Sequence, residues 1–126
     1  MTNILQVTPF LHVPDMKRAL DLFTRVLRFE IKYRASGYAY LERESAAIRI
    51  LEEPGRERPA KGERLRISAC IDVRDVDSLY RELLAELKTL PEGDVHAPMD
   101  ERWGQRDFHV RLPDGNWLAF TQPTKR

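Results

Sequence analysis

The sequence predicts an α+β fold, built from two βαβββ modules that form curved mixed sheets around a central trough. Two amphipathic stripes of helical spacing lie 60 residues apart, and each follows a strand-like run. Two or three further segments of strand character come after each stripe. One helix on a half-open sheet buries too little apolar surface to be stable, so the modules must pair within a single domain of 126 residues.

The first module is expected over about residues 1–58. A strand at 7–13 leads into a helix whose apolar stripe runs from Met16 to Leu27. Asp15 stands directly before this stripe, where a carboxylate can accept the free N–H groups of the first helical turn, so we interpret it as a cap. Three strands are expected to follow, at 29–34, 37–42 and 46–51.

The second module, over about residues 62–126, repeats this order. A strand at 65–73 precedes Asp75, again read as a cap, and a helical stripe from Val76 to Leu87. Two strands, 107–112 and 116–122, flank Pro113-Asp114-Gly115, which is typical of a tight turn because Pro fixes φ and Gly supplies positive φ. The intervening stretch 90–106 is rich in Pro and Gly, and we predict a functional loop there.

In the strands, the repeat is expected at a displacement of 70 residues. This displacement aligns Tyr38 with Phe108 and Tyr40 with Val110. The trough between two such curved sheets is where a ligand site belongs.

Composition excludes several classes of function. The 21 Lys and Arg residues balance 20 Asp and Glu residues to a net charge of +1, so no global field attracts nucleic acid. No apolar run approaches the roughly 20 residues that a membrane helix needs, and no signal peptide is evident. We expect a cytoplasmic protein with no nucleic-acid or membrane partner. Cys70 is the one cysteine and is expected to be a small buried side chain.

Five segments carry a family resemblance over nearly the whole chain. They are 10–16 (FLHVPDM), 37–43 (GYAYLER), 96–98 (HAP), 103–104 (WG) and 112–116 (LPDGN). The Trp-Gly loop followed by the Leu-Pro-Asp-Gly-Asn turn is the most specific feature. Together these segments resemble the glyoxalase, bleomycin resistance and extradiol dioxygenase superfamily, also called the vicinal oxygen chelate superfamily, and most closely its bleomycin resistance proteins.

The resemblance also locates four positions at which enzymes of the superfamily bind a divalent metal. Counting from the helix caps and the turn places them at Thr8, Arg49, Ser68 and Ala119. None is a normal metal ligand, and Arg49 would place a fixed positive charge where the cation belongs. We therefore expect no metal at these positions and no cofactor.

The histidines show no metal-binding spacing. His12, His96 and His109 form neither an HxH nor an HxxxH pattern, so we interpret them as hydrogen-bonded or partly exposed side chains rather than as ligands of one metal.

Seven residues are predicted to bind a ligand in the trough, because aromatic faces and a guanidinium bind planar and charged groups well. They are Trp103, Arg49, Tyr40, Tyr38, Phe10, His12 and Phe108. Core packing is the alternative for the strand aromatics. Trp103 stands out, because the resemblance implies a loop Trp at the drug crevice. Arg49 needs a partner, either an internal carboxylate such as Glu42 or an anionic ligand.

These residues favour a non-enzymatic protein that binds or sequesters an aromatic or amphipathic small molecule. One alternative is a metal-independent enzyme, in which His12 or His109 acts as a base near Arg49. A metal-dependent lyase or dioxygenase is another. The resemblance also implies a homodimer in which the partner completes the trough.

Overall fold

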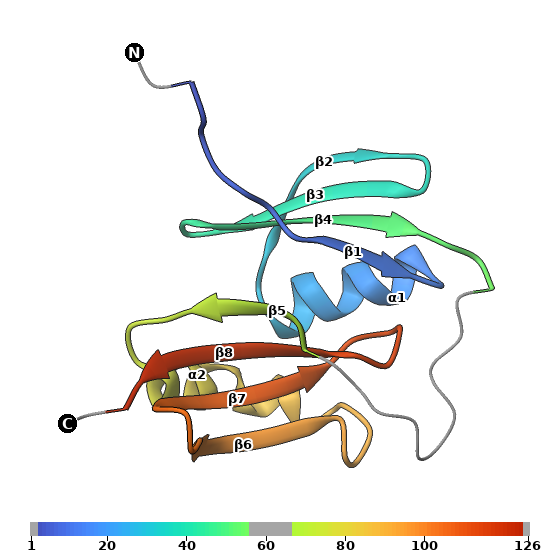
Figure 1. The fold of residues 1–126 in the computed structure, drawn as a ribbon. Coiled ribbons are helices and arrows are strands. Elements are labelled where there is room, and N and C mark those ends of the chain that lie inside the picture. Colours follow the sequence, from blue (N-terminus) through green and yellow to red (C-terminus); the bar gives the residue numbers. More distant parts are fainter. Residues whose placement is uncertain (1–2, 56–66, 125–126) are drawn as a thin grey trace.

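The computed structural model describes residues 3–55 and 67–124, and it confirms the predicted α+β architecture. The strands form two four-stranded sheets. Figure 1 shows α1 beside the first sheet and α2 beside the second. The elements are β1 (Phe10–Val13), α1 (Met16–Asp21), η1 (Leu22–Val26), β2 (Glu30–Ala35), β3 (Tyr38–Arg43), β4 (Ala46–Glu52), β5 (Ile67–Asp72), α2 (Val76–Leu87), β6 (Val95–Asp100), β7 (Gln105–Arg111) and β8 (Trp117–Pro123).

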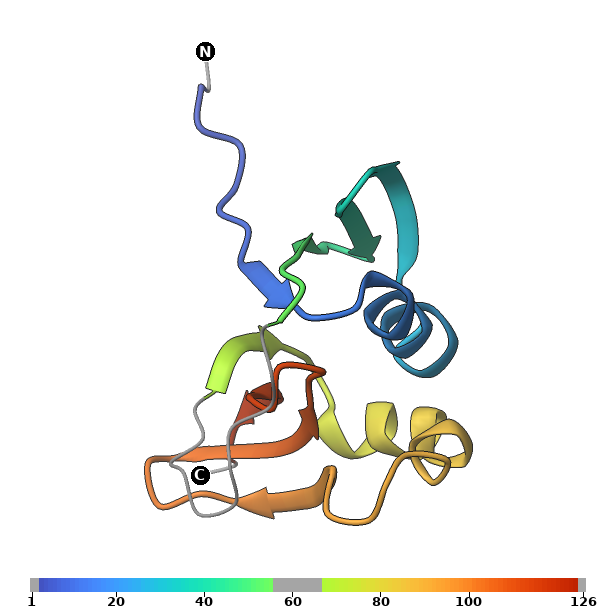
Figure 2. The ribbon, with the colours of Figure 1, turned by 90° about the vertical axis from the view of Figure 1, so that its right-hand side faces the viewer.

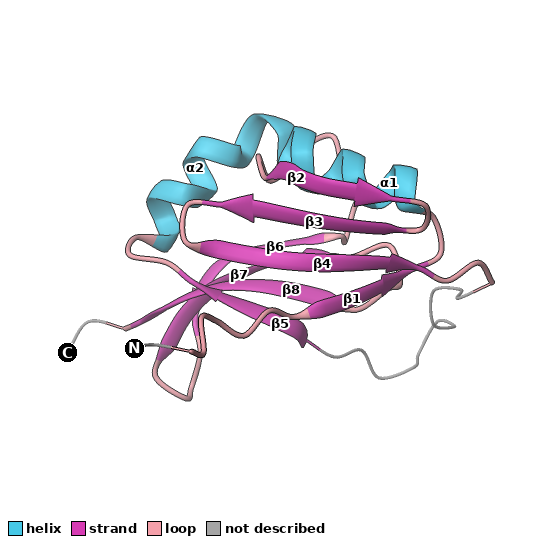
Figure 3. Cartoon of the chain, turned by 90° about the horizontal axis from the view of Figure 1, so that it is seen from above, coloured by secondary structure: helices cyan, strands magenta, loops and turns pink. Residues whose placement is uncertain are grey.

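The two sheets repeat one topology. Sheet A has the order β1-β4-β3-β2 and sheet B the order β5-β8-β7-β6, with a parallel pair β1–β4 or β5–β8 and antiparallel pairs elsewhere. The strands β1 and β5 lie where the sheets meet, and both helices lie on the same side of the sheets (Figures 2 and 3). Each sheet therefore has a face covered by helices and an opposite face, which we call its open face.

The covered faces form the hydrophobic core. In sheet A, alternate side chains of β1, β3 and β4 are almost fully buried, and these are Leu11, Val13, Ala39, Leu41, Ile48 and Ile50. In sheet B, Phe108, Val110, Leu118 and Phe120 have the same role. Phe23 and Leu83 pack against them from the helices. The alternation leaves the other residues of each strand on the open face.

Both predicted helix caps are confirmed. The Asp15 carboxylate accepts hydrogen bonds from the backbone N–H groups of Lys17, at 2.9 Å, and Arg18, at 3.3 Å. Asp75 accepts one from the N–H of Ser78 at 3.1 Å. The predicted turn is also present: Gly115 has φ of 92° and donates its N–H to the carbonyl of Leu112.

The stretch 90–106 differs from its prediction, because it contains a strand. Val95–Asp100 forms β6 and pairs antiparallel with β7, so only the residues on either side of it form loops. Pro98 is tolerated because β6 is an edge strand, and the pairing register shifts between His96 and Met99.

Three other features bear on the sequence predictions. The expected boundary between the modules lies outside the described residues. Cys70 is exposed on the open face of sheet B, so the prediction of a buried side chain is wrong. No helix among residues 3–55 and 67–124 is long and apolar enough to cross a membrane.

The register of β7 also corrects the internal alignment. Tyr40 lies opposite Arg49 in sheet A, and His109 lies opposite Ala119 in sheet B. His109, 69 residues after Tyr40, is therefore its structural counterpart, and the expected displacement of 70 is wrong for this strand. A slip of one residue moves every side chain of a strand to the other face.

Candidate functional site

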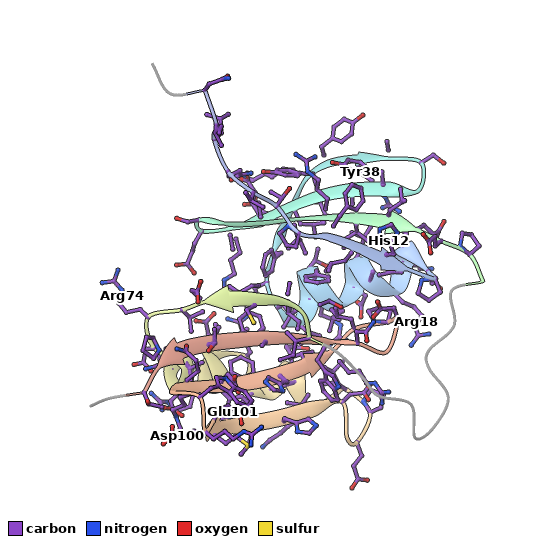
Figure 4. All side chains as sticks on the ribbon, viewed as in Figure 1. His12, Arg18, Tyr38, Arg74, Asp100 and Glu101 are labelled. Atoms are coloured by element: carbon purple, nitrogen blue, oxygen red, sulfur yellow. The ribbon has the colours of Figure 1, made fainter. Side chains whose placement is uncertain are left out.

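Five of the seven predicted ligand residues lie together on the open face of sheet A. They are Phe10, His12, Tyr38, Tyr40 and Arg49, which alternate with the buried residues of β1, β3 and β4. Tyr38 and His12 can be followed in Figure 4. The period of two in each strand, together with the pairing of neighbouring strands, brings them onto one surface.

Arg49 lies at the centre of this surface and has no carboxylate partner among the described residues. Its Nε donates to the hydroxyl of Thr8 at 3.0 Å, and one terminal nitrogen donates to the Tyr38 hydroxyl. The guanidinium carbon lies 4.8 Å from the centre of the Tyr40 ring. Glu42, the partner considered from sequence, accepts a hydrogen bond from the Tyr40 hydroxyl at 3.2 Å instead.

Aromatic rings extend this surface to either side of the guanidinium. The centre of the Phe10 ring lies 6.0 Å from that of Tyr38 and 5.6 Å from that of His12. Tyr33 on β2, which sequence reasoning missed, lies 6.0 Å from Tyr38. Sequence alternation places Tyr33 on the same face as Ile31, but the pairing register shifts between these two residues, and Tyr33 pairs with Tyr40 of the open face. Phe10 is 47% exposed and Tyr33 59%, so a planar molecule can reach both rings.

His12 is held by an acidic neighbour at the edge of the surface. Its Nδ1 lies 2.9 Å from a carboxylate oxygen of Glu53, and both side chains are more than a third exposed. The carboxylate orients the imidazole ring, so His12 offers a polar group in a defined orientation beside the aromatic residues.

The other two predicted residues lie elsewhere. Phe108 is completely buried on the covered face of sheet B, stacked on Phe120 and edge-on to Tyr80, so it does not reach the trough. The sequence analysis placed Phe108 in the trough because the internal alignment is off by one residue in β7. Trp103 lies in the turn between β6 and β7 and is 59% exposed. It belongs to sheet B, so the structure does not bring it together with the five residues on sheet A.

The four positions that the family resemblance assigned to metal ligation are Thr8, Arg49, Ser68 and Ala119. Thr8 and Arg49 are in hydrogen-bond contact, and Ala119 pairs with Cys70, two residues after Ser68. A hydroxyl, a guanidinium and a methyl group are poor donors for a divalent cation. The residues present do not fit the family's metal site.

A different polar cluster lies on the open face of sheet B. Glu101, Asp107 and His109 each offer a ligand atom, and these atoms lie within 4.8 Å of one another. Burial, followed by the hydrogen bond and charge of Asp107, raises the pKa of the Glu101 carboxyl, and the charge of His109 opposes this rise. The sequence analysis missed the cluster, because the internal alignment predicted that Phe108, rather than its neighbours Asp107 and His109, faces the trough.

A crevice with a volume of about 880 Å³ lies between the modules. Its walls come from the β3–β4 turn on one side and from β5 and the start of α2 on the other. Arg43 bridges the modules by donating to Glu82 at 2.7 Å. None of the seven predicted residues lines this crevice, so the sequence-based site and the crevice are different places.

Comparison with known proteins is consistent with this geometry. Residues 3–120 match the model of the glyoxalase/bleomycin resistance protein/dioxygenase superfamily. Curated relatives include a bleomycin resistance protein of Geobacillus stearothermophilus and one of Staphylococcus aureus. Each is 28% identical over 137 aligned positions, which cover 97% of this chain and 99% of the relative.

Solved structures show the same fold. A bleomycin-binding protein in complex with bleomycin superposes with a TM-score of 0.76 at 24% identity, covering 96% of this chain and 100% of that chain. The bleomycin-binding protein of Streptomyces verticillus, complexed with copper(II)-bleomycin, gives 0.75 at 22% identity, covering 98% and 100%. A bleomycin resistance determinant encoded on the transposon Tn5 gives 0.75 at 23% identity, covering 97% and 100%.

Proposed function

The chain belongs to the glyoxalase/bleomycin resistance protein/dioxygenase superfamily, and from this premise we propose that it binds and sequesters an aromatic or amphipathic small molecule without turning it over. The observation that carries the proposal is the open face of sheet A, where exposed aromatic rings surround an arginine without a carboxylate partner among the described residues. The curated relatives, named as bleomycin resistance proteins, support a sequestering role over a catalytic one.

Arg49 determines the charge of the proposed ligand. A half-buried guanidinium whose partners are two hydroxyls and a ring gains more from an anionic group than from a neutral one. With a net charge of +1, the chain adds no field that favours a cation. We therefore propose an aromatic ligand that carries an acidic group, bound without a metal at the family positions. Its ring lies against Phe10 and Tyr38.

The open face needs a second wall, and we propose that another copy of the chain supplies it. The segment before β1 contacts sheet A through Gln6 and Thr8, and its start extends beyond the sheets (Figure 1). Ile4, Leu5 and Val7 in it are more than 80% exposed. An apolar segment and an uncovered sheet face on the same chain are complementary surfaces for a symmetric dimer. Trp103 in this arrangement would line the trough from the partner's sheet B.

The test uses an anionic aromatic probe, 8-anilinonaphthalene-1-sulfonate, titrated by fluorescence. Arg49→Met is expected to weaken its binding about tenfold or more, because a charge-assisted hydrogen bond contributes roughly 1.5–3 kcal/mol. The matched control is Arg81→Met on the exposed surface of α2, which removes the same charge far from sheet A and should leave the affinity unchanged.

Equal affinities for the wild type and Arg49→Met would contradict the assignment of the site to sheet A. Bleomycin is the second ligand to titrate. A stronger preference for bleomycin than for the anionic probe would contradict the proposed ligand charge and retain the sequestering function.

An enzyme remains the alternative, because Glu53 orients His12 as a catalytic carboxylate orients a base. The same titrations separate the two functions. Saturable binding with the ligand recovered unchanged supports sequestration. Turnover that His12→Ala abolishes, and that a chelator does not affect, supports the enzyme.

A further inference from the structure

Three side chains that the proposed function does not use converge on the open face of sheet B. Asp107 and His109 are alternate residues of β7, so both point away from the helices, and Glu101 comes from the turn that follows β6. Figure 4 shows Glu101 at the β6–β7 end of the lower sheet. His109 Nε2 lies 3.1 Å from Asp107 Oδ1 and 4.0 Å from Glu101 Oε2.

Two of these atoms, Asp107 Oδ1 and His109 Nε2, are buried and make no well-directed hydrogen bond with any described residue, although they lie within ion-pair distance of each other. The Asp107 side chain is 5% exposed, and the side chains of Glu101 and His109 are 13% and 18% exposed. Asp107 Oδ1 and His109 Nε2 are both inaccessible to solvent, and neither makes a hydrogen bond with the described part of the chain. Leaving buried polar atoms unsatisfied is costly, and more so for a charged group, so the arrangement calls for a ligand.

The charge of the cluster indicates which kind of ligand it would bind. With both carboxyl groups ionised, the cluster carries a net negative charge whether or not the imidazole is protonated. A cation at their centre would remove the repulsion between the acids and satisfy the orphaned atoms at once.

We propose that Glu101, Asp107 and His109 bind a divalent transition-metal ion. One imidazole nitrogen and two carboxylate oxygens are donors that Zn²⁺, Co²⁺, Ni²⁺ and Mn²⁺ accept. Ligands about 2.1 Å from a metal lie roughly 3 to 4 Å from one another, and the two distances from His109 Nε2 lie in that range. Three protein ligands leave positions open for water or for an atom of a bound molecule.

This site is distinct from the family's metal positions. Those fall at Thr8, just before β1, at Ser68 on β5, and at Arg49 and Ala119 on the last strand of each module, whereas β7 is the third strand of the second module. The structural repeat shows the difference directly, because Tyr38 and Tyr40 occupy in sheet A the places that Asp107 and His109 occupy in sheet B. The proposal replaces our expectation of no cofactor, which rested on the family positions and on histidine spacing.

The experiment titrates chelator-treated full-length protein with Zn²⁺ by calorimetry and with Co²⁺ by visible absorption. We expect one ion per chain at micromolar affinity or tighter. Asp107→Asn, Glu101→Gln and His109→Ala should each weaken binding at least tenfold. His12→Ala is the matched control, since among the described residues His12 and Glu53 belong to no group of three potential metal ligands, and it should bind metal as the wild type does.

A measurement on the unmodified protein tests the proposal even if a substitution at a buried position prevents folding. Zn²⁺ should shift the imidazole NMR signals of His109 and leave those of His12 in place. No binding of Zn²⁺ or Co²⁺ at millimolar concentration would overturn the proposal. So would binding that survives all three substitutions, or a zinc response confined to His12 or His96.

Discussion

At the scale of single residues, β7 shows why the candidate site was only partly predictable. The alternation of polar and apolar residues from Asp107 to Arg111 was visible in the sequence, and it places Phe108 and Val110 on one face and His109 on the other. The internal alignment was given more weight than this alternation and was off by one residue. For sheet A the alternation and the alignment agree, so Arg49 and its aromatic neighbours share one sheet face in the structure, and their role in ligand binding stays a prediction.

The contrast between Phe108 and Phe10 gives a prediction about stability and binding. Phe108→Ala should lower the free energy of unfolding by about 3–5 kcal/mol, because it leaves a cavity between Tyr80 and Phe120. Phe10→Ala should cost much less, since Phe10 is 47% exposed, but should weaken binding of the anionic aromatic probe. Urea unfolding measures the first effect and the fluorescence titration the second. Similar losses of stability in the two variants would contradict the assignment of the faces.

At the scale of elements, the helices were predictable and β6 was not. Each helix combines an apolar stripe with an aspartate cap, and these two independent signals agree. In β6 the apolar residues Val95, Ala97 and Met99 also alternate, but Pro98 interrupts them inside a stretch rich in Pro and Gly. Only its place at the edge of a sheet makes that proline acceptable, and edge position is a property of the folded sheet.

A bidentate ion pair joins α2 to β7. The guanidinium of Arg106 donates to both carboxylate oxygens of Asp77, at 2.9 and 3.0 Å, and also to Asp100 at 3.1 Å. The hydrogen bond from Arg106 lowers the pKa of Asp77 below its ordinary value. A depressed carboxyl pKa stabilises the fold above the unfolded-state pKa, and the contribution is lost as the pH falls through the folded-state pKa.

Asp77→Asn should therefore destabilise the protein slightly near neutral pH, and the difference from the wild type should shrink as the solution becomes more acidic than the ordinary Asp pKa of about 4. Urea unfolding midpoints between neutral and acidic pH measure the difference. Glu92→Gln, on the exposed loop after α2, is the control and should show no such trend. A difference that stays constant down to the lowest pH would contradict the role of the ion pair.

At the scale of the whole molecule, the small size of each module predicts that the two modules pair. It does not predict how the proposed ligand residues are distributed over the two sheets. The residues that the sequence placed in one trough lie on two sheets, with Arg49 on sheet A and Trp103 on sheet B. Which sheet faces which across the trough depends on how the modules and the chains are placed relative to one another. This placement leaves no periodic signal in the sequence. A second copy of the chain is the simplest way to bring a tryptophan of one sheet B against an arginine of another sheet A.

The last prediction concerns that assembly. Light scattering at micromolar concentration should give twice the mass of one chain, and replacing both Leu5 and Val7 with Glu should convert the protein to single chains. These side chains are 88% and 93% exposed in the isolated chain, so charging them costs the monomer's own packing almost nothing and acts on the interface alone. Arg81→Glu on the surface of α2 is the control and should remain dimeric. A single-chain mass for the unmodified protein would contradict the dimer, and the ligand would then reach the open face of sheet A directly from solvent.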